Sequence, residues 1–440
     1  MIPYSELFYF YILILVSIPA VVLGLLQRTI KYYGLAATVF MLFIIFGSSV
    51  QQLFFLGFFI GFEFLLIRSY LFICRKPRYG FTILFGIIVN LFILMFLYYS
   101  KPNQQMVYFI VFFVAETILI AGYVLFGIRY RKTFLLFTTV LLAISPLVLA
   151  KFGDVLIHQK EIGFLGISYL TFKVVQMVIE THDGLIKKIS VFEYLYFLLY
   201  FPTISSGPID RSRRFMENIS VAPARAEYIE LLGDGLFNMF LGVGYKFVLS
   251  NLISKYWMAD IPAAHTLVNT INYMYAYSFY LFFDFAGYSL IAIGVSNIFG
   301  IRTPANFNKP FISSDIKDFW NRWHMSLSFW FRDFIYTRIV MSSLKNKSMR
   351  RQKYLASYAG YIITMGLMGI WHGTALYFIL YGLYHGVLLV LTDLYQRKLP
   401  WYPKVKNNIV WKCMSVAITF NLICFGFLIF SGYLFTTQTK

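Results

Sequence analysis

Long apolar runs constrain the fold of this chain more than any other feature. An α-helix needs ~20 residues to cross ~30 Å of hydrocarbon, and apolar runs of about that length recur along nearly all 440 residues. The runs lie at 8–26, 53–67, 81–98, 107–127, 134–150, 231–252, 273–299, 362–391 with an internal break, and 415–435. Because 59% of the residues are hydrophobic and the mean hydropathy is +0.69, a soluble globular domain is excluded. The sequence predicts an all-α polytopic membrane protein with roughly eleven transmembrane helices.

The basic residues indicate how the helices are oriented. The formal net charge is +19, but Lys and Arg occur in short clusters between apolar runs, not on one soluble domain that could bind nucleic acid. Loops rich in Lys and Arg stay on the cytoplasmic side of a membrane. The alternation of basic-rich and basic-poor loops therefore predicts a multi-pass cell-membrane protein whose N-terminus is extracellular.

Nothing in the sequence marks a second domain. There is no fixed-period repeat, no low-complexity segment and no long polar linker. We expect a single membrane domain over residues 1–440, with N-terminal helices at 1–162, a core at 163–393 and a C-terminal helix at 394–440. The three cysteines share no metal-ligand spacing, so no metal site is expected.

Two segments break the helical pattern with proline or glycine. In 201–215, "FPTISSGPIDRSRRF", the prolines force the backbone out of helical geometry. Irregular backbone is tolerated in a membrane where it is buried in protein or faces water, so a re-entrant or interfacial turn is expected. In 366–386, "GLMGIWHGTALYFILYGLYHG", two apolar helices flank a Trp-His-Gly motif.

A third break, at 302–318, is polar and ends in residues that can cap a helix. An apolar stripe at helical spacing then runs from Ile316 to Phe334, which predicts one amphipathic helix. Its many charges exclude a transmembrane position, so it should lie in the interface or dip into the protein. Its polar face carries Asn321, His324 and Ser328.

His372, in the Trp-His-Gly motif, is the strongest candidate for chemistry. An ionisable group at membrane depth is costly and is rarely kept without a partner or a role. Because histidine exchanges protons near neutral pH, His372 is either a catalytic base or a buried hydrogen-bonded residue. Taken alone, His324 is more typical of a solvated side chain. Asp284, also inside an apolar run, should pair with another group or line a water-filled cavity.

The remaining features suggest direct acyl transfer. His158 and His265 fall in loops, His182 borders a turn, and His385 is typical of a core residue. The chain lacks an HExxH metal motif, a phosphate-binding loop and a G-x-S-x-G nucleophile motif. A base without a protein nucleophile would take a proton from an acceptor hydroxyl, which would attack an activated acyl group.

Three motifs resemble the membrane-bound O-acyltransferase family. They are "DFAGYSLIAIG" at 284–294, "NFNKPFISSDIKDFWNRWHMSLSFWFRDFIY" at 306–336, and "GIWHG" at 369–373. The resemblance implies a ring of transmembrane helices around a thinned central tunnel, with re-entrant and interfacial helices. It places the family's histidine on His372 and its second active-site position, histidine or asparagine, on His324.

The motifs are most similar to family members that D-alanylate teichoic acid. That implies transfer of D-alanine from a phosphopantetheine thioester on a cytosolic D-alanyl carrier protein to an acceptor hydroxyl outside, for lipoteichoic acid. A membrane partner of the same system and membrane lipid would be further partners, with no bound cofactor and no nucleic acid. Acetyl transfer to an exopolysaccharide of alginate type is the alternative within the family. A transporter with His and Asp proton relays is the alternative outside it.

Two sets of residues are expected to serve the catalytic pair. The active-site tunnel should include Asn321, Ser328, Trp371, Gly373 and Asp284. An apolar spot with a basic rim, which could instead contact lipid, should dock the carrier through Arg338, Val340 and Met341.

Overall fold

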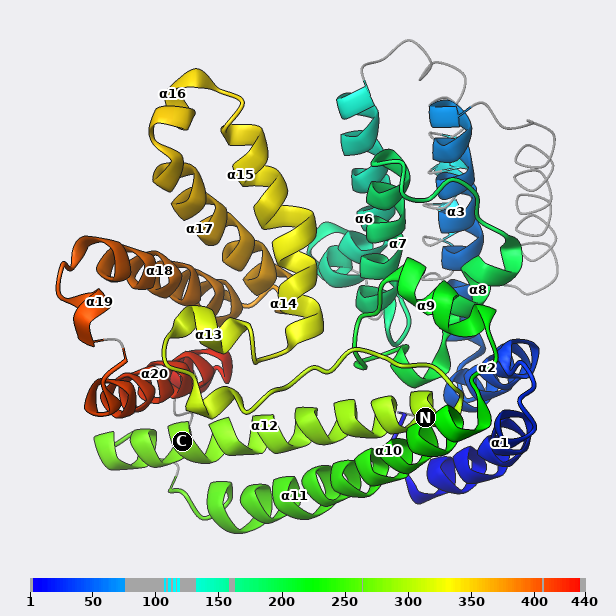
Figure 1. Ribbon diagram of the computed structural model, residues 1–440, viewed down its shortest axis with the longest axis horizontal. Helices are drawn as coiled ribbons and strands as arrows, with labels where there is room; N and C mark the ends of the chain where they lie inside the picture. The colour runs from blue at the N-terminus through cyan, green and yellow to red at the C-terminus, as the bar shows by residue number, and fades with distance from the viewer. Residues whose placement is uncertain are drawn as a thin grey trace. The chain divides into compact units, whose positions relative to one another are not determined.

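The computed structural model describes residues 3–75, 132–157, 163–262, 264–405 and 407–435, together with isolated positions between 107 and 118. Every regular element in these residues is helical (Figure 1), which confirms the predicted all-α class. The predicted run at 81–98, most of the run at 107–127, and His158 lie outside the described residues.

Seven helices in the described part of the chain are long and apolar enough to cross a membrane, so the multi-pass prediction is confirmed. They are Leu7–Leu25, Gln51–Leu71, Thr133–Gly153, Arg225–Met258, Leu267–Ile298, Leu376–Lys398 and Ile409–Phe430. The residue contacts divide the chain into two compact units. Unit 1 comprises Met1–Gly235 with Val295–Thr303, and unit 2 comprises Leu236–Gly294 with Pro304–Lys440. The assignment of a single domain stays a prediction.

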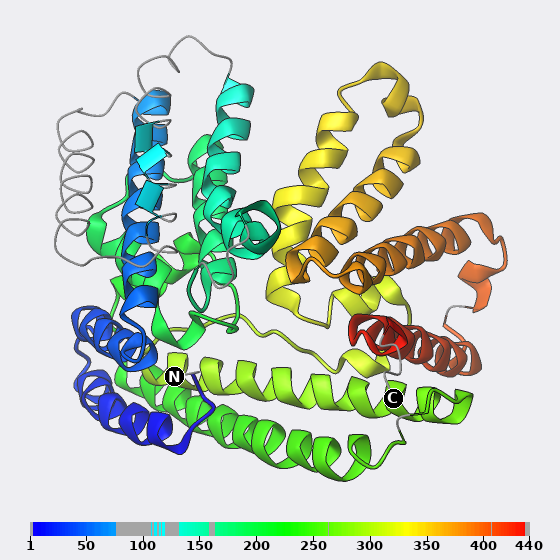
Figure 2. The same cartoon turned by 180° about the vertical axis from the view of Figure 1, so that it is seen from behind.

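Unit 1 holds the N-terminal helices. They are α1 Leu7–Leu25, α2 Lys31–Phe46, α3 Val50–Arg75, α6 Lys132–Ile157, α7 Ile167–His182, α8 Val191–Leu199, α9 Ser212–Ser220 and the first part of α10 Arg225–Val243. Within this unit α3, α6 and α7 pack against one another, as Figure 2 shows from behind. Lys173 of α7 is fully buried, and its Nζ donates to the carbonyl oxygens of Phe197 and Leu198 at 3.1 and 3.3 Å. It thereby satisfies free carbonyls at the C-terminal end of α8.

The predicted break at 201–215 begins with a single 3-10 turn, η2 Phe201–Thr203, and continues as irregular backbone before α9. Its residues are mostly buried, and Asp210 accepts hydrogen bonds from the Arg211 backbone and the Arg214 side chain. Irregular backbone is therefore buried in protein here, as a membrane protein requires.

Unit 2 contains the motif-bearing segments. It holds the end of α10, the π-helical turns η3 Gly244–Leu249 and η4 Ile253–Met258 on either side of α11 Ser250–Leu252, most of α12 Leu267–Ile298, η5 Pro310–Ile312, α13 Ile316–Trp320, α14 Met325–Phe331, η6 Arg332–Tyr336, α15 Thr337–Ser343, α16 Lys347–Arg351, α17 Lys353–His372, α18 Leu376–Lys398, α19 Tyr402–Val405, α20 Ile409–Phe430 and η7 Tyr433–Phe435. Helix α18 packs against both α17 and α20 (Figure 1).

The prediction of one continuous helix from Ile316 to Phe334 is wrong. Helix α13 ends at Trp320 and α14 begins at Met325, and between them His324 adopts left-handed backbone angles, φ 42° and ψ 51°. The preceding loop holds this break, because Met325 N donates to the Asn306 carbonyl at 2.8 Å. The side chain of Asn306 is held in turn by Ser326 at 2.6 Å and by Ser289 at 3.0 Å. The apolar stripe could not reveal these bonds, because they join residues about 20 positions apart.

The α17–α18 pair depends on glycines that let the two backbones touch. A Cβ on Gly382 would lie 2.3 Å from the Met365 carbonyl oxygen, whereas one on Gly366 would meet only Leu383 at 3.7 Å. We expect Gly382→Ala to destabilise the protein by about 1–3 kcal/mol, because backbone must move, and Gly366→Ala to be tolerated. Thermal unfolding in detergent would measure both. If the Gly382→Ala and Gly366→Ala variants melted at the same temperature, close backbone packing would not explain the glycine at 382.

Candidate active site

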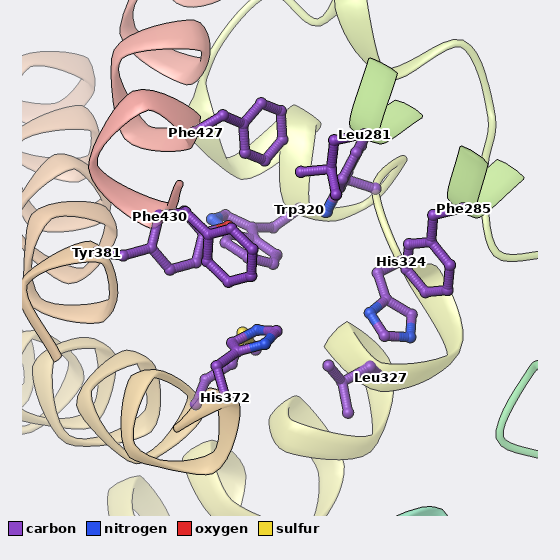
Figure 3. A pocket seen from close by; sticks show the side chains of 11 residues that line it. Leu281, Phe285, Trp320, His324, Leu327, His372, Tyr381, Phe427 and Phe430 are labelled. Carbon is purple, nitrogen blue, oxygen red and sulfur yellow. The ribbon is translucent and has the colours of Figure 1, made fainter. Parts of the chain in front are cut away.

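His324 and His372 line the same cavity in unit 2 (Figure 3). His324 comes from the break between α13 and α14, and His372 is the last residue of α17. The cavity has a volume of about 70 Å³. Its other lining residues are Leu281, Phe285, Trp320, Trp323, Leu327, Met368, Tyr381, Phe427 and Phe430. Two titratable rings therefore share a small, largely aromatic chamber.

His324 is a buried ring, 5% exposed, and is not a solvated residue on a polar face. Phe285 packs edge-on against it with ring centroids 4.6 Å apart. Its Nε2 has no hydrogen-bond partner among the described residues, so this atom is available to a substrate. Burial, and next the nearby His372, lower the pKa of His324. The lowered pKa favours the uncharged form of the ring.

His372 stands at the carboxyl end of α17, among aromatic rings. Phe430 packs edge-on at 4.9 Å between ring centroids, and the Trp371 ring lies at 4.6 Å. Gly373 follows in extended conformation, and a Cβ there would lie 2.6 Å from the Phe378 ring. The glycine thus lets the chain turn into α18 beside the histidine.

A second cavity of about 260 Å³ adjoins the first, because Trp320 and Met368 line both. Asn321 and Ser328 line this second cavity and not the first, and Ser328 Oγ donates to the Trp323 carbonyl at 3.0 Å. The remaining lining residues include two cations, Lys317 and Arg332, and two tyrosines, Tyr336 and Tyr361. Polar and charged groups therefore lie beyond the aromatic chamber.

The other predicted tunnel residues occupy different places. Trp371 and Gly373 lie beside His372 without lining either cavity. Asp284 is not brought to either cavity, and its carboxylate accepts from Lys246 Nζ at 2.6 Å. Asp284 therefore pairs with another group, which is one of the two predicted alternatives, although its side chain is 39% exposed.

The predicted docking residues come soon after residues of the second cavity in the sequence. Arg338, Val340 and Met341 lie on α15, which directly succeeds η6, where Arg332 and Tyr336 line that cavity. Met341 is 61% exposed, whereas Val340 is half-buried against Gly360. One short helix thus leads from the cavity to an exposed methionine.

Sequence reasoning missed the walls of the cavity. Tyr381 and Phe430 belong to apolar helices, and no periodicity separates a residue that lines a cavity from one that packs a core. His385, expected in the core, is fully buried against Tyr381 and Trp320, with ring centroids 4.7 and 5.3 Å away.

The family is identified by comparison with known sequences. The sequence profile of MBOAT, the membrane-bound O-acyltransferase family, matches residues 130–436. The chain is a membrane-bound O-acyltransferase. It is 43% identical to the teichoic acid D-alanyltransferase of Bacillus subtilis (strain 168) over 350 residues, which cover 77% of this chain and 88% of that protein. With the Streptococcus thermophilus protein of the same name it shares 43% identity over 309 residues, 67% of this chain and 74% of that one.

A second group of relatives is more distant. The chain is 30% identical to the probable alginate O-acetylase AlgI of Pseudomonas aeruginosa over 272 residues, 60% of this chain and 48% of that protein. The motifs at 284–294, 306–336 and 369–373 all fall inside the region that the family profile matches. This membrane-bound O-acyltransferase is accordingly an enzyme of acyl transfer.

Proposed function

We propose that this acyltransferase moves D-alanine from a carrier-protein thioester on the cytosolic side to an acceptor hydroxyl on the extracellular side, for D-alanylation of lipoteichoic acid. The observation that carries the proposal is the small cavity shared by His324 and His372, in a chain 43% identical to teichoic acid D-alanyltransferases. One water needs about 10–15 Å³, so 70 Å³ holds about five to seven water-sized groups. That room suits the carbonyl, methyl and amino groups of an alanyl unit.

The reaction needs one base and one oxyanion donor. His372 accepts the proton of the acceptor hydroxyl as its oxygen attacks the thioester carbon. His324 donates a ring N–H to the oxyanion that forms on the carbonyl oxygen. The carbon–sulfur bond then breaks, and the leaving thiolate takes the proton held by His372. The products are the D-alanyl ester and the free pantetheine thiol.

The second cavity supplies a route for the donor. The phosphopantetheine arm carries an anionic phosphate and amide groups behind its thioester. Arg332 is paired with Asp333 at 2.9 Å and Lys317 with Asp393 at 2.5 Å, so the phosphate would compete with these carboxylates for the two cations. Asn321 and Ser328 offer hydrogen bonds to the amides. Because Trp320 and Met368 line both cavities, an arm in the second would present its thioester to the first.

Docking of the carrier is assigned to α15 on the cytosolic side. Carrier proteins of this type are acidic, and Arg338 would steer their approach while Met341 and Val340 supply apolar contact. Independently of this helix, the distribution of basic loops predicts an extracellular N-terminus. The membrane partner of the same system and the lipoteichoic acid would then approach from outside.

Met341→Glu should raise the KM for the charged carrier about tenfold or more, because it places a negative charge where an acidic partner docks. Its kcat should change little, since Met341 lines neither cavity. Initial rates against carrier concentration would measure both constants. Met341→Leu, which keeps an apolar side chain, is the matched control, and an unchanged KM in the Glu variant would remove α15 from the docking surface.

Acetyl transfer to an exopolysaccharide is the second candidate, favoured by the 30% identity to the probable alginate O-acetylase. The two functions differ in the acyl group that reaches the acceptor. Membranes containing the protein and its acceptor would be supplied either with carrier charged with labelled D-alanine or with a labelled acetyl donor. We expect the mass increment of an alanyl group on the acceptor; an acetyl increment alone would overturn the proposal.

A further inference from the structure

We propose that the aromatic wall of the first cavity binds the ammonium group of the aminoacyl donor. The wall consists of Trp320, Tyr381, Phe427 and Phe430, which lie together on one side of the gap between the two histidines (Figure 3). This inference rests on the proposed function, because a D-alanyl thioester carries an ammonium group and an acetyl thioester does not.

The cavity offers two kinds of apolar surface. Two leucines line it as well as the aromatic wall: Leu327 lies near His324, and Leu281 lies near Trp320 and Phe427 (Figure 3). A D-alanyl group held by its carbonyl between the two histidines has a methyl and an ammonium on the same carbon. The leucines suit the methyl group, and the faces of the aromatic wall suit the ammonium.

A cation in such a chamber needs compensation, because taking charge out of water is costly. Among the described residues, no Asp or Glu side chain lines either cavity. Aromatic faces carry negative potential and attract an ammonium within ~6 Å of the ring centroid, more strongly when water is excluded. Burial also lowers the pKa of His324, which disfavours a second positive charge beside the substrate.

The aromatic wall is held by contacts between its rings and with a neighbouring ring. Phe430 lies 5.1 Å from Tyr381 between ring centroids, at an interplanar angle of 65°, and Phe427 lies 6.5 Å from Tyr381. Phe427 also lies 4.7 Å from Trp323, outside the wall. The rings come from α13, α18 and α20, so three helices fix their positions before substrate enters. A preformed site of this kind loses little entropy on binding.

The experiment compares carrier charged with D-alanine and carrier charged with propionate, which has the same carbon skeleton without the ammonium. In Tyr381→Leu and in Phe427→Leu, the ratio of D-alanyl to propionyl kcat/KM should fall about 5- to 30-fold relative to wild type. Tyr381→Phe keeps a ring and should retain the ratio within about twofold. Phe240→Leu is the matched control, since Phe240 is 76% exposed and lines neither cavity.

Taking a ratio separates recognition from structural damage, because a distorted cavity slows both acyl groups equally. An unchanged ratio in both leucine variants would overturn the inference while leaving D-alanyl transfer intact. If those variants do not fold, the wild-type enzyme provides the test. Its ratio of D-alanyl to propionyl kcat/KM is divided by the ratio of the uncatalysed reaction rates of the two thioesters. A corrected ratio of about one would overturn the inference, and a wild type that transfers neither group would overturn the proposed function with it.

Discussion

Replacing His372 by alanine is expected to lower D-alanyl transfer by about 10²- to 10⁴-fold, the usual contribution of a positioned general base. His372 lines the cavity at the carboxyl end of α17, within the small chamber that it shares with His324. The loss should appear in kcat with the KM for the carrier little changed, because the docking helix α15 is untouched. Transfer of labelled D-alanine from charged carrier in membranes is the measurement.

His265→Ala is the matched control for this variant. His265 is exposed, stacks on Tyr433 with ring centroids 4.3 Å apart, and lines neither cavity. The same change of side chain should therefore leave the rate near that of wild type. A His372→Ala enzyme that transfers label at the wild-type rate would remove His372 from the reaction.

The fold class, and the two histidines that line the first cavity, could be predicted from sequence for different physical reasons. The length of an apolar run is fixed by the thickness of the bilayer, so the helices were visible without any tertiary information. His372 stood out because an ionisable group is costly between two apolar helices. His324 had no such signal, and only the resemblance of its motif to the family brought it to the site.

Other parts of the site depend on contacts that a linear pattern does not contain. The turn at His324 is held by the backbone of Asn306, and Asp284 is paired with Lys246, 38 residues earlier on another helix. Tyr381 and Phe430 meet across two helices to form part of the aromatic wall. Each of these features depends on how distant segments of unit 2 pack together, which the periodicity of one segment does not reveal.

His324 should also be required, and its left-handed backbone permits a test that separates its ring from its conformation. Loss of an oxyanion donor lowers kcat by about 10²- to 10³-fold, so His324→Gly and His324→Ala should both show that loss. Glycine adopts φ 42° without strain, whereas alanine does not, so the alanine variant should also melt at a lower temperature than the glycine variant.

His324→Asn completes the test, because asparagine tolerates left-handed backbone and keeps a donor near the position of the ring. Its kcat should lie between those of wild type and His324→Gly, with the melting temperature preserved. Thermal unfolding and transfer of labelled D-alanine, measured on the same preparations, would give the melting temperature and the kcat of each variant. A glycine variant with the wild-type kcat would show that the ring takes no part in the reaction, and the strained turn would then serve only to join α13 to α14.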